Sequence, residues 1–255
     1  MCLALFVLSI AVPASAQLES YSDLLEEPGF GTQRYYPLSD PDSQMRDGSP
    51  AAQDGSYLGT PALGVDGPLF GIPLGGRAVG FDGATSHSTF EMPSLGSALG
   101  SPDGVTIVAW FRTSSSAAGT LIGSYSQATR LNGFEIGLGK NEYWYLSHAE
   151  KIAFAVSQGP SIYRSASILA SNFSNGEWHM IVCGIRAGTI SMWYDGLPRA
   201  ITLASSGTLG SFQDLTFPVT IACADDGGTL ESFKAADVAN VSIHNRLLND
   251  SDVLA

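Results

Sequence analysis

The chain has 255 residues and a formal net charge of −12, with 12 Lys and Arg against 24 Asp and Glu. Nucleic acids and anionic membrane surfaces bind basic proteins, so this charge disfavours both as partners. The 29 Gly and 13 Pro interrupt the chain too often for long helices and favour many short strands. A chain of this length fits one large β domain.

An apolar run opens the chain. Residues 2–10 carry no charge, and Ala14-Ser-Ala16 is typical of a signal-peptide cleavage site. The run is well short of the ~20 residues that span a membrane. Two interpretations of residues 1–17 stay open, a cleaved secretory signal and a retained strand that docks on this domain or on a neighbouring subunit. A mature chain starting at Gln17 favours secretion, and a retained Met1 favours assembly. Residues 18–255 are predicted to form the β domain.

Short elements separated by Gly, Ser, Asn, Asp and Pro are predicted along the rest of the chain. Residues 19–27 are expected to form a short helix, residues 39–76 an irregular loop with one strand near Tyr57, and residues 249–255 a final capped helical turn. The other predicted strands are 35–38, 78–81, 87–92, 105–112, 120–125, 133–138, 143–146, 152–156, 215–223 and 238–244. The short gaps between residues 105 and 156 are typical of an antiparallel meander.

The stretch 175–196 is the most informative. Residues 180–185 and 189–194 are rich in β-branched and aromatic side chains and flank a Gly-containing turn, which predicts an antiparallel hairpin. Asp195-Gly196 predicts a second turn, after which residues 197–203 are expected to return as one further strand.

The first strand of this hairpin is apolar on both faces. Trp178, Met180 and Val182 share one face, and Ile181 and Cys183 share the other. The strand is therefore predicted to be covered on both sides, in a sheet that packs against a second layer. We expect Trp178 and its neighbours in the middle of that two-layer core.

Four segments of the chain resemble segments of a known family and occur in the same order. Gly176-Glu-Trp-His179, the apolar strand and Trp193-Tyr-Asp-Gly196 are similar to the signature hairpin of laminin G-like domains, which belong to the concanavalin A-like lectin and glucanase superfamily. Residues 80–83, 105–112 and 238–248 are similar to other strands of that family. The resemblance implies an all-β, antiparallel two-sheet jelly-roll sandwich, of a kind also found in phage virion proteins. The sequence also predicts short helical turns near both termini.

The superfamily includes endoglucanases, which makes a catalytic role one alternative. Retaining glycosidases need two carboxylates about 5 Å apart, which a Glu-x-Asp or Glu-x-Asp-x-x-Glu pattern would place on one face of a strand. No Glu of this chain is followed two positions later by Asp or Glu. The four His have no metal-binding spacing. The sequence therefore predicts no catalytic residues and no enzyme, with a glycoside hydrolase as a remote alternative.

Calcium is the one cofactor that the resemblance suggests. Laminin G-like and pentraxin relatives often bind Ca²⁺ at one rim through Asp carboxylates and loop carbonyls. Asp225 and Asp226 form an acidic turn before two Gly, and Asp82 and Asp195 each precede a Gly. These four are the candidate calcium ligands. The alternative is that the Asp-Gly pairs serve only the turns themselves.

A glycan site needs aromatic faces beside polar groups. Residues 141–146 are the densest aromatic cluster, and Tyr143, Trp144 and Tyr145 are the candidate glycan-binding residues. On a strand, the two tyrosines would project to one side and Trp144 to the other, so only one side is expected to face a sugar.

The three Cys have no metal-binding spacing. Cys183 and Cys223 lie in predicted strands and are expected to be small buried hydrophobes, since a disulfide would require neighbouring strands.

Two function classes follow. The first is a structural or attachment protein of a virion or cell surface, such as a decoration, tail or fibre component, with residues 2–16 as an assembly strand. The second is a secreted, Ca²⁺-dependent, lectin-like carbohydrate-binding module. Both predict an extracellular or virion-surface location and a glycan or protein partner.

Overall fold

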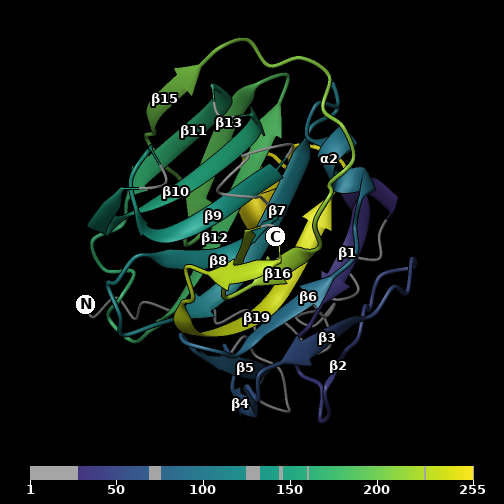
Figure 1. The fold of residues 1–255 in the computed structure, drawn as a ribbon, viewed down its shortest axis with the longest axis vertical. Helices are drawn as coiled ribbons and strands as arrows, with labels where there is room; N and C mark the ends of the chain where they lie inside the picture. Colours follow the sequence, from purple (N-terminus) through teal and green to yellow (C-terminus); the bar gives the residue numbers. More distant parts are fainter. Residues whose placement is uncertain are drawn as a thin grey trace, which may run out of the picture.

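Two antiparallel sheets pack face to face in the computed structural model (Figure 1), which describes residues 28–68, 76–124, 133–143, 146–159, 161–226 and 228–254. Sheet A has the order β14-β13-β12-β7-β19-β5-β4, with β1 also paired to β19. Sheet B has the order β15-β11-β10-β9-β8-β16-β6-β3-β2. The predicted all-β antiparallel sandwich is confirmed.

The bounds of these elements follow. Sheet A contains β1 (Thr32–Tyr36), β4 (Ala62–Asp66), β5 (Arg77–Asp82), β7 (Val105–Arg112), β12 (Trp178–Arg186), β13 (Thr189–Tyr194), β14 (Leu197–Pro198) and β19 (Ala235–His244). Sheet B contains β2 (Gln44–Met45), β3 (Gly55–Leu58), β6 (His87–Phe90), β8 (Gly119–Ser124), β9 (Gly133–Lys140), β10 (Ser147–Gly159), β11 (Ile162–Leu169), β15 (Thr202–Ser206) and β16 (Val219–Ile221). A small hairpin pairs β17 (Ala224–Asp226) with β18 (Thr229–Glu231), and the helices are η2 (Pro28–Phe30), α2 (Ser94–Ala98) and α3 (Asp250–Leu254).

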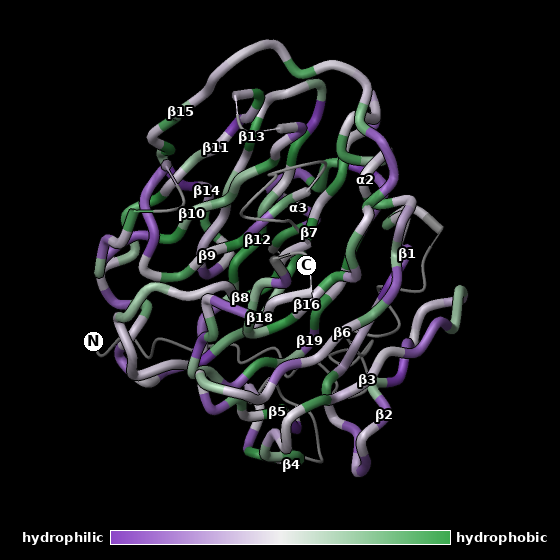
Figure 2. Tube along the Cα trace, in the orientation of Figure 1, coloured by the Kyte–Doolittle hydropathy of each residue, from purple (hydrophilic) through white to green (hydrophobic). Residues whose placement is uncertain are grey.

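The core lies between the two sheets and follows the alternation of the strands. Phe111, Ile181 and Val238 point inward from sheet A, and Ile136 and Phe154 point inward from sheet B; all five are fully buried. Figure 2 shows hydrophobic stretches concentrated along the central strands and hydrophilic ones in the turns.

The expectation that Trp178 lies in the middle of this core is wrong. Met180 and Val182 face the outer side of sheet A, in a separate cluster with Trp193, and Trp178 lies on that side only partly buried. The C-terminal Leu248 packs onto this outer cluster. Because β12 is apolar on both faces, its sequence predicted that both would be covered but did not identify the inner one.

The two turns of the hairpin are confirmed. Ala187 and Gly188 have φ angles of 49° and 79°, and Asp195 and Gly196 have φ angles of 53° and 75°. Two consecutive positive φ angles are the geometry of the two-residue turns that match the twist of paired strands.

Other strand predictions need correction. Residues 197–203 are not one strand, since β14 pairs in sheet A and β15 pairs in sheet B. Tyr143 lies in a turn and Leu146 in a bend, so 143–146 is not a strand over its described residues. Strand β11 and the β17–β18 hairpin were not predicted, and the described part of residues 39–76 contains three strands rather than one. Residues 1–27, with the apolar run and the expected first helix, lie outside the described residues.

The predicted helical turn at the C-terminus is confirmed as α3. Asn249 Oδ1 accepts hydrogen bonds from the backbone N–H groups of Ser251 (2.9 Å) and Asp252 (3.2 Å), which is the arrangement of a helix N-cap. Trp193 Nε1 donates to Asp250 Oδ1 at 2.8 Å and fixes this helix against the outer face of sheet A. No helix among the described residues is long and apolar enough to cross a membrane.

Cys183 and Cys223 are buried free thiols, as expected. Cys183 lies in sheet A, whereas Cys223 follows β16 of sheet B, so neighbouring strands do not bring them together. Burial raises the pKa of Cys223 to about 12 and that of Cys183 well above its usual range, which keeps both thiols protonated and unreactive.

The buried His244, at the end of β19, contacts Phe30 and is expected to make the folded chain less stable in acid. Its Nδ1 lies 3.2 Å from the carbonyl oxygen of Phe30, and its Nε2 lies 3.0 Å from Ser242 Oγ. Burial lowers the pKa of His244 to about 4. The unfolded chain therefore binds the proton more readily, and stability falls as pH drops from about 6.5 to 4.

Lowering the pH from 7 to 4.5 is expected to reduce the free energy of unfolding of both the parent and a His244→Gln variant. The reduction is expected to be roughly 2 kcal/mol smaller in the variant than in the parent. Urea denaturation of both proteins at the two pH values measures this difference. Equal losses in the two proteins would show that His244 is not responsible.

Candidate functional site

The candidate site lies at the turn between β9 and β10, where Tyr143 is 41% exposed. Beside it, Glu142 Oε2 accepts hydrogen bonds from Lys151 Nζ (2.9 Å) and Ser167 Oγ (2.8 Å). Lys151 is paired across the sheet with Leu169, which is 62% exposed. These five residues come from strands β10 and β11 of sheet B and from the turn between β9 and β10 (Figure 1 shows the strands), and are called the Tyr143 patch.

The polar part of the Tyr143 patch is held in place. Partial burial acts to raise the pKa of Glu142, but hydrogen bonds from Lys151 and Ser167 outweigh it and leave the pKa below its usual value. Glu142 is thus a carboxylate with a fixed direction, and the exposed Tyr143 is the next residue in the chain. Of the three aromatic residues predicted to bind glycans, only Tyr143 is described, since Trp144 and Tyr145 lie outside the described residues.

Two of the candidate calcium ligands, Asp82 and Asp225, accept hydrogen bonds within their own turns. Asp82 Oδ1 accepts from the backbone N–H groups of Ala84, Thr85 and Ser86, each at 2.9 Å, and these bonds hold the pKa of Asp82 far below its usual range. Asp225 Oδ1 accepts from the N–H of Gly228.

Asp195 likewise has protein partners, since it accepts from the backbone N–H of Met180 and contacts His179 Nδ1 at 2.9 Å. The side chain of Asp226 lies outside the described residues. Among the residues that the structure describes, no group of three or more His, Cys, Asp or Glu is arranged to hold a metal ion. Calcium binding therefore stays a prediction.

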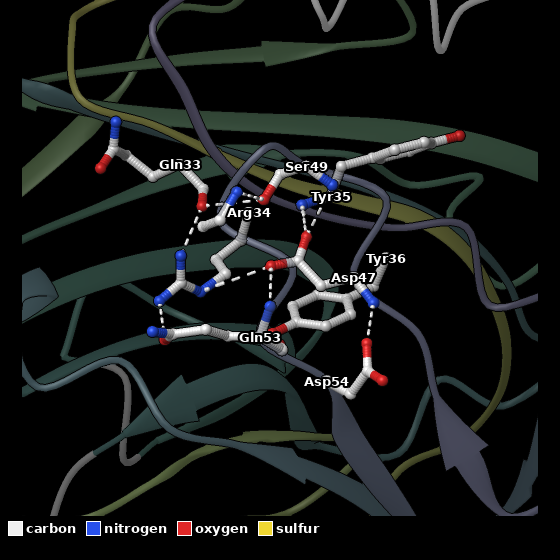
Figure 3. Close-up of polar contacts among 9 residues, drawn as sticks. Gln33, Arg34, Tyr35, Tyr36, Asp47, Ser49, Gln53 and Asp54 are labelled. Atoms are coloured by element: carbon white, nitrogen blue, oxygen red, sulfur yellow. Dashed lines mark hydrogen bonds and ion pairs between the residues drawn. The ribbon is translucent and has the colours of Figure 1, made fainter.

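A second polar cluster, missed by sequence reasoning, joins β1 to the segment 46–54 (Figure 3). The carboxylate of Asp47 accepts from the backbone N–H groups of Tyr35 (3.0 Å), Ser49 (2.8 Å) and Gln53 (3.0 Å), and it faces Arg34 at 3.8 Å. Arg34 and Asp47 are both buried. Since both carboxylate oxygens are occupied by this chain, the cluster stabilises the fold.

Comparison with known proteins decides the family. A family model, Laminin_G_3, described as the concanavalin A-like lectin/glucanases superfamily, matches residues 82–254. The chain belongs to this superfamily. A search of curated proteins finds no match.

Solved structures agree with the superfamily fold. The botulinum neurotoxin serotype C1 binding domain aligns with a TM-score of 0.60 and 13% identity, over 88% of this chain and 50% of that one. A mutant sialidase of Trypanosoma rangeli with trans-sialidase activity aligns with a TM-score of 0.58 and 15% identity, over 89% of this chain and 32% of that one. This chain thus spans half the length of the first and a third of the second, and the likeness shows the fold alone.

In this superfamily member, β9 comes nearest to a glucanase pattern. Glu135 lies on the outer side of sheet B, and Gly137 and Lys140 stand where Glu-x-Asp-x-x-Glu would have its second and third carboxylates. Gly139 has a φ of 68°. The Lys140 side chain lies across Gly137, since a Cβ added at Gly137 would be only 2.6 Å from Lys140 Cδ. Lys140 Nζ donates to Glu135 Oε1 at 2.5 Å.

The Glu135–Lys140 ion pair is buried, with side chains 1% and 7% exposed. Thr120 Oγ1 also donates to Glu135 Oε1, at 2.6 Å, whereas Oε2 has no partner among the described residues. A retaining mechanism needs a second carboxylate beside the first, and here an ammonium group occupies that place. The arrangement supports an ion pair that maintains the sheet rather than a glycosidase site.

Proposed function

We propose that the protein is a non-catalytic, glycan-binding β-sandwich that acts on the surface of a virion or cell. The Tyr143 patch carries this proposal, because it combines an exposed aromatic residue with a fixed carboxylate and an ammonium group. Aromatic rings pack against the apolar faces of sugars, and charged groups form the stronger hydrogen bonds to their hydroxyls.

The structural neighbours support binding as the general role. Cell entry of botulinum neurotoxin type C, one of these neighbours, is dependent upon interaction with two ganglioside molecules. The binding domain of botulinum neurotoxin DC, another neighbour, is in complex with rat synaptotagmin II. Proteins that share this fold over half of their own length thus interact with gangliosides or with a protein. The exposed Tyr143 beside polar groups favours the glycan for this chain.

The alternatives differ in calcium and in location. A secreted lectin-like module would require Ca²⁺, with Asp225 and Asp226 as the proposed ligands. A virion decoration, tail or fibre component would retain residues 2–16 for assembly. The glycoside hydrolase alternative is remote, because the position beside Glu135 is taken by Lys140.

A Tyr143→Ala variant is expected to bind its glycan about tenfold more weakly, since removal of an aromatic contact of about 1–2 kcal/mol corresponds to that factor. A glycan array followed by calorimetry, with Ca²⁺ and again with EDTA, measures the effect. Leu197→Ala is the matched control, because Leu197 is 55% exposed on the edge strand β14 of sheet A.

Equal binding by Tyr143→Ala and the control would show that the patch is not the site. Loss of binding in EDTA would support the calcium-dependent alternative.

A further inference from the structure

A row of side chains crosses the outer face of sheet A at one end of its strands. The pairing register places Asp237 of β19 beside Arg112 of β7, and Arg112 beside Trp178 of β12. On the other side of Asp237 the row continues with Gly80 and Ala62. Their strand neighbours, among them Phe111 and Val238, point into the core, so these residues face outward.

The row is ordered by its own contacts. Arg112 donates from Nε (2.9 Å) and Nη2 (2.7 Å) to the same atom, Asp237 Oδ2. The guanidinium carbon lies 5.1 Å from the centroid of the Trp178 ring, a cation–π contact. The three side chains are therefore held in one arrangement before any ligand arrives, which lowers the entropic cost of binding.

The row also keeps hydrogen-bonding capacity toward solvent. The side chains of Arg112 and Asp237 are 30% and 27% exposed. Arg112 uses Nε and Nη2, and Asp237 uses Oδ2, for their mutual contact, so within the described part of the chain the N–H groups of Arg112 Nη1 and the Oδ1 acceptor of Asp237 remain for a ligand. Gly80 leaves room for this acceptor, since a Cβ there would lie 2.8 Å from Asp237 Oδ1.

A neighbouring part of this face is covered. Leu247, Leu248 and Val253 from the C-terminal segment pack with Phe30 over the apolar cluster that contains Met180 and Trp193. The Asp237–Arg112–Trp178 row lies beyond that cover, at the ends of β7 and β12, and its two charges cancel.

We propose that the Asp237–Arg112–Trp178 row is a second carbohydrate site, separate from the Tyr143 patch, and that it binds an uncharged sugar through two adjacent hydroxyl groups. One hydroxyl donates to Asp237 Oδ1 and its neighbour accepts from Arg112 Nη1, while the Trp178 ring packs against the apolar face of the sugar. A neutral ligand suits a neutral ion pair in a chain of net charge −12, because an acidic sugar would meet overall repulsion.

The test is a titration of the whole chain with uncharged hexasaccharides, namely maltohexaose, laminarihexaose and mannohexaose, with sialyllactose as the acidic comparison. Tryptophan fluorescence and calorimetry are recorded for the parent and for Arg112→Ala/Asp237→Ala, Trp178→Phe and Tyr143→Ala. The double variant removes one positive and one negative charge and leaves the net charge unchanged. Circular dichroism checks that each variant is folded.

At least one neutral hexasaccharide is expected to change the fluorescence of the parent and of Tyr143→Ala. The apparent affinity of the double variant is expected to fall at least tenfold, and Trp178→Phe to lose most of the fluorescence change. The proposal is overturned if no neutral hexasaccharide binds, if sialyllactose binds more tightly, or if both row variants bind like the parent. Loss of all binding in Tyr143→Ala alone would refute the second site and leave the Tyr143 patch as the proposed one.

Discussion

Replacing Asp47 with Ala is expected to lower the free energy of unfolding by about 3–5 kcal/mol, because it leaves a buried positive charge without its partner. The Arg34 and Asp47 side chains are 9% and 0% exposed. The substitution also removes the acceptor of three backbone N–H groups, those of Tyr35, Ser49 and Gln53 (Figure 3). Buried donors without acceptors add to the cost.

Urea denaturation of Asp47→Ala beside Asp42→Ala measures this effect. Asp42 also pairs with an arginine, Arg46, but its side chain is 52% exposed. An exposed pair contributes at most about 1 kcal/mol, so the control is expected to unfold close to the parent. If the two variants were equally stable, the Asp47 cluster would not stabilise the fold as inferred.

The second large effect is expected at Lys140. Lys140→Met should lower the free energy of unfolding by about 3–5 kcal/mol, because Glu135 then remains as a buried carboxylate without a positive charge. Its Oε2 already has no hydrogen-bond partner in the described part of the chain, so the loss of Lys140 leaves only Thr120 as a donor.

The double variant Glu135→Leu/Lys140→Met separates charge from packing. Replacing a buried ion pair with apolar side chains of similar volume is often neutral or stabilising, so the double variant is expected to recover most of the loss. The unfolding free energies of the parent, both single variants and the double variant form a mutant cycle. A double variant as unstable as Lys140→Met would show that packing, not the unpaired charge, sets the cost.

Local sequence signals identified most strands of this sandwich. The hairpin of β12 and β13 followed from two apolar runs and an Ala-Gly turn, and the positive φ angles of Ala187 and Gly188 confirm that prediction. Strand β11 was missed although Ser165 and Ser167 alternate with the buried Ala166 and Ile168, a period-two pattern that would have revealed it.

Pairing between distant segments escaped prediction for a physical reason. The Asp237–Arg112–Trp178 row joins residues that are 66 and 59 positions apart along the chain, counted from 112 to 178 and from 178 to 237, and only strand register aligns them. Likewise, the spacing of Glu135 and Lys140 was visible, but the positive φ of Gly139 and the path of the Lys140 side chain were not.

The all-β class, the turns and the alternation of apolar side chains could be predicted from the order of residues alone, because these features depend on neighbours within a few positions. Three outcomes emerged only in the folded chain: which face of β12 is inner, how residues 197–206 divide between two sheets, and which polar side chains meet. Those outcomes depend on strand register and on competition between two apolar faces, and both are set by contacts across the whole chain.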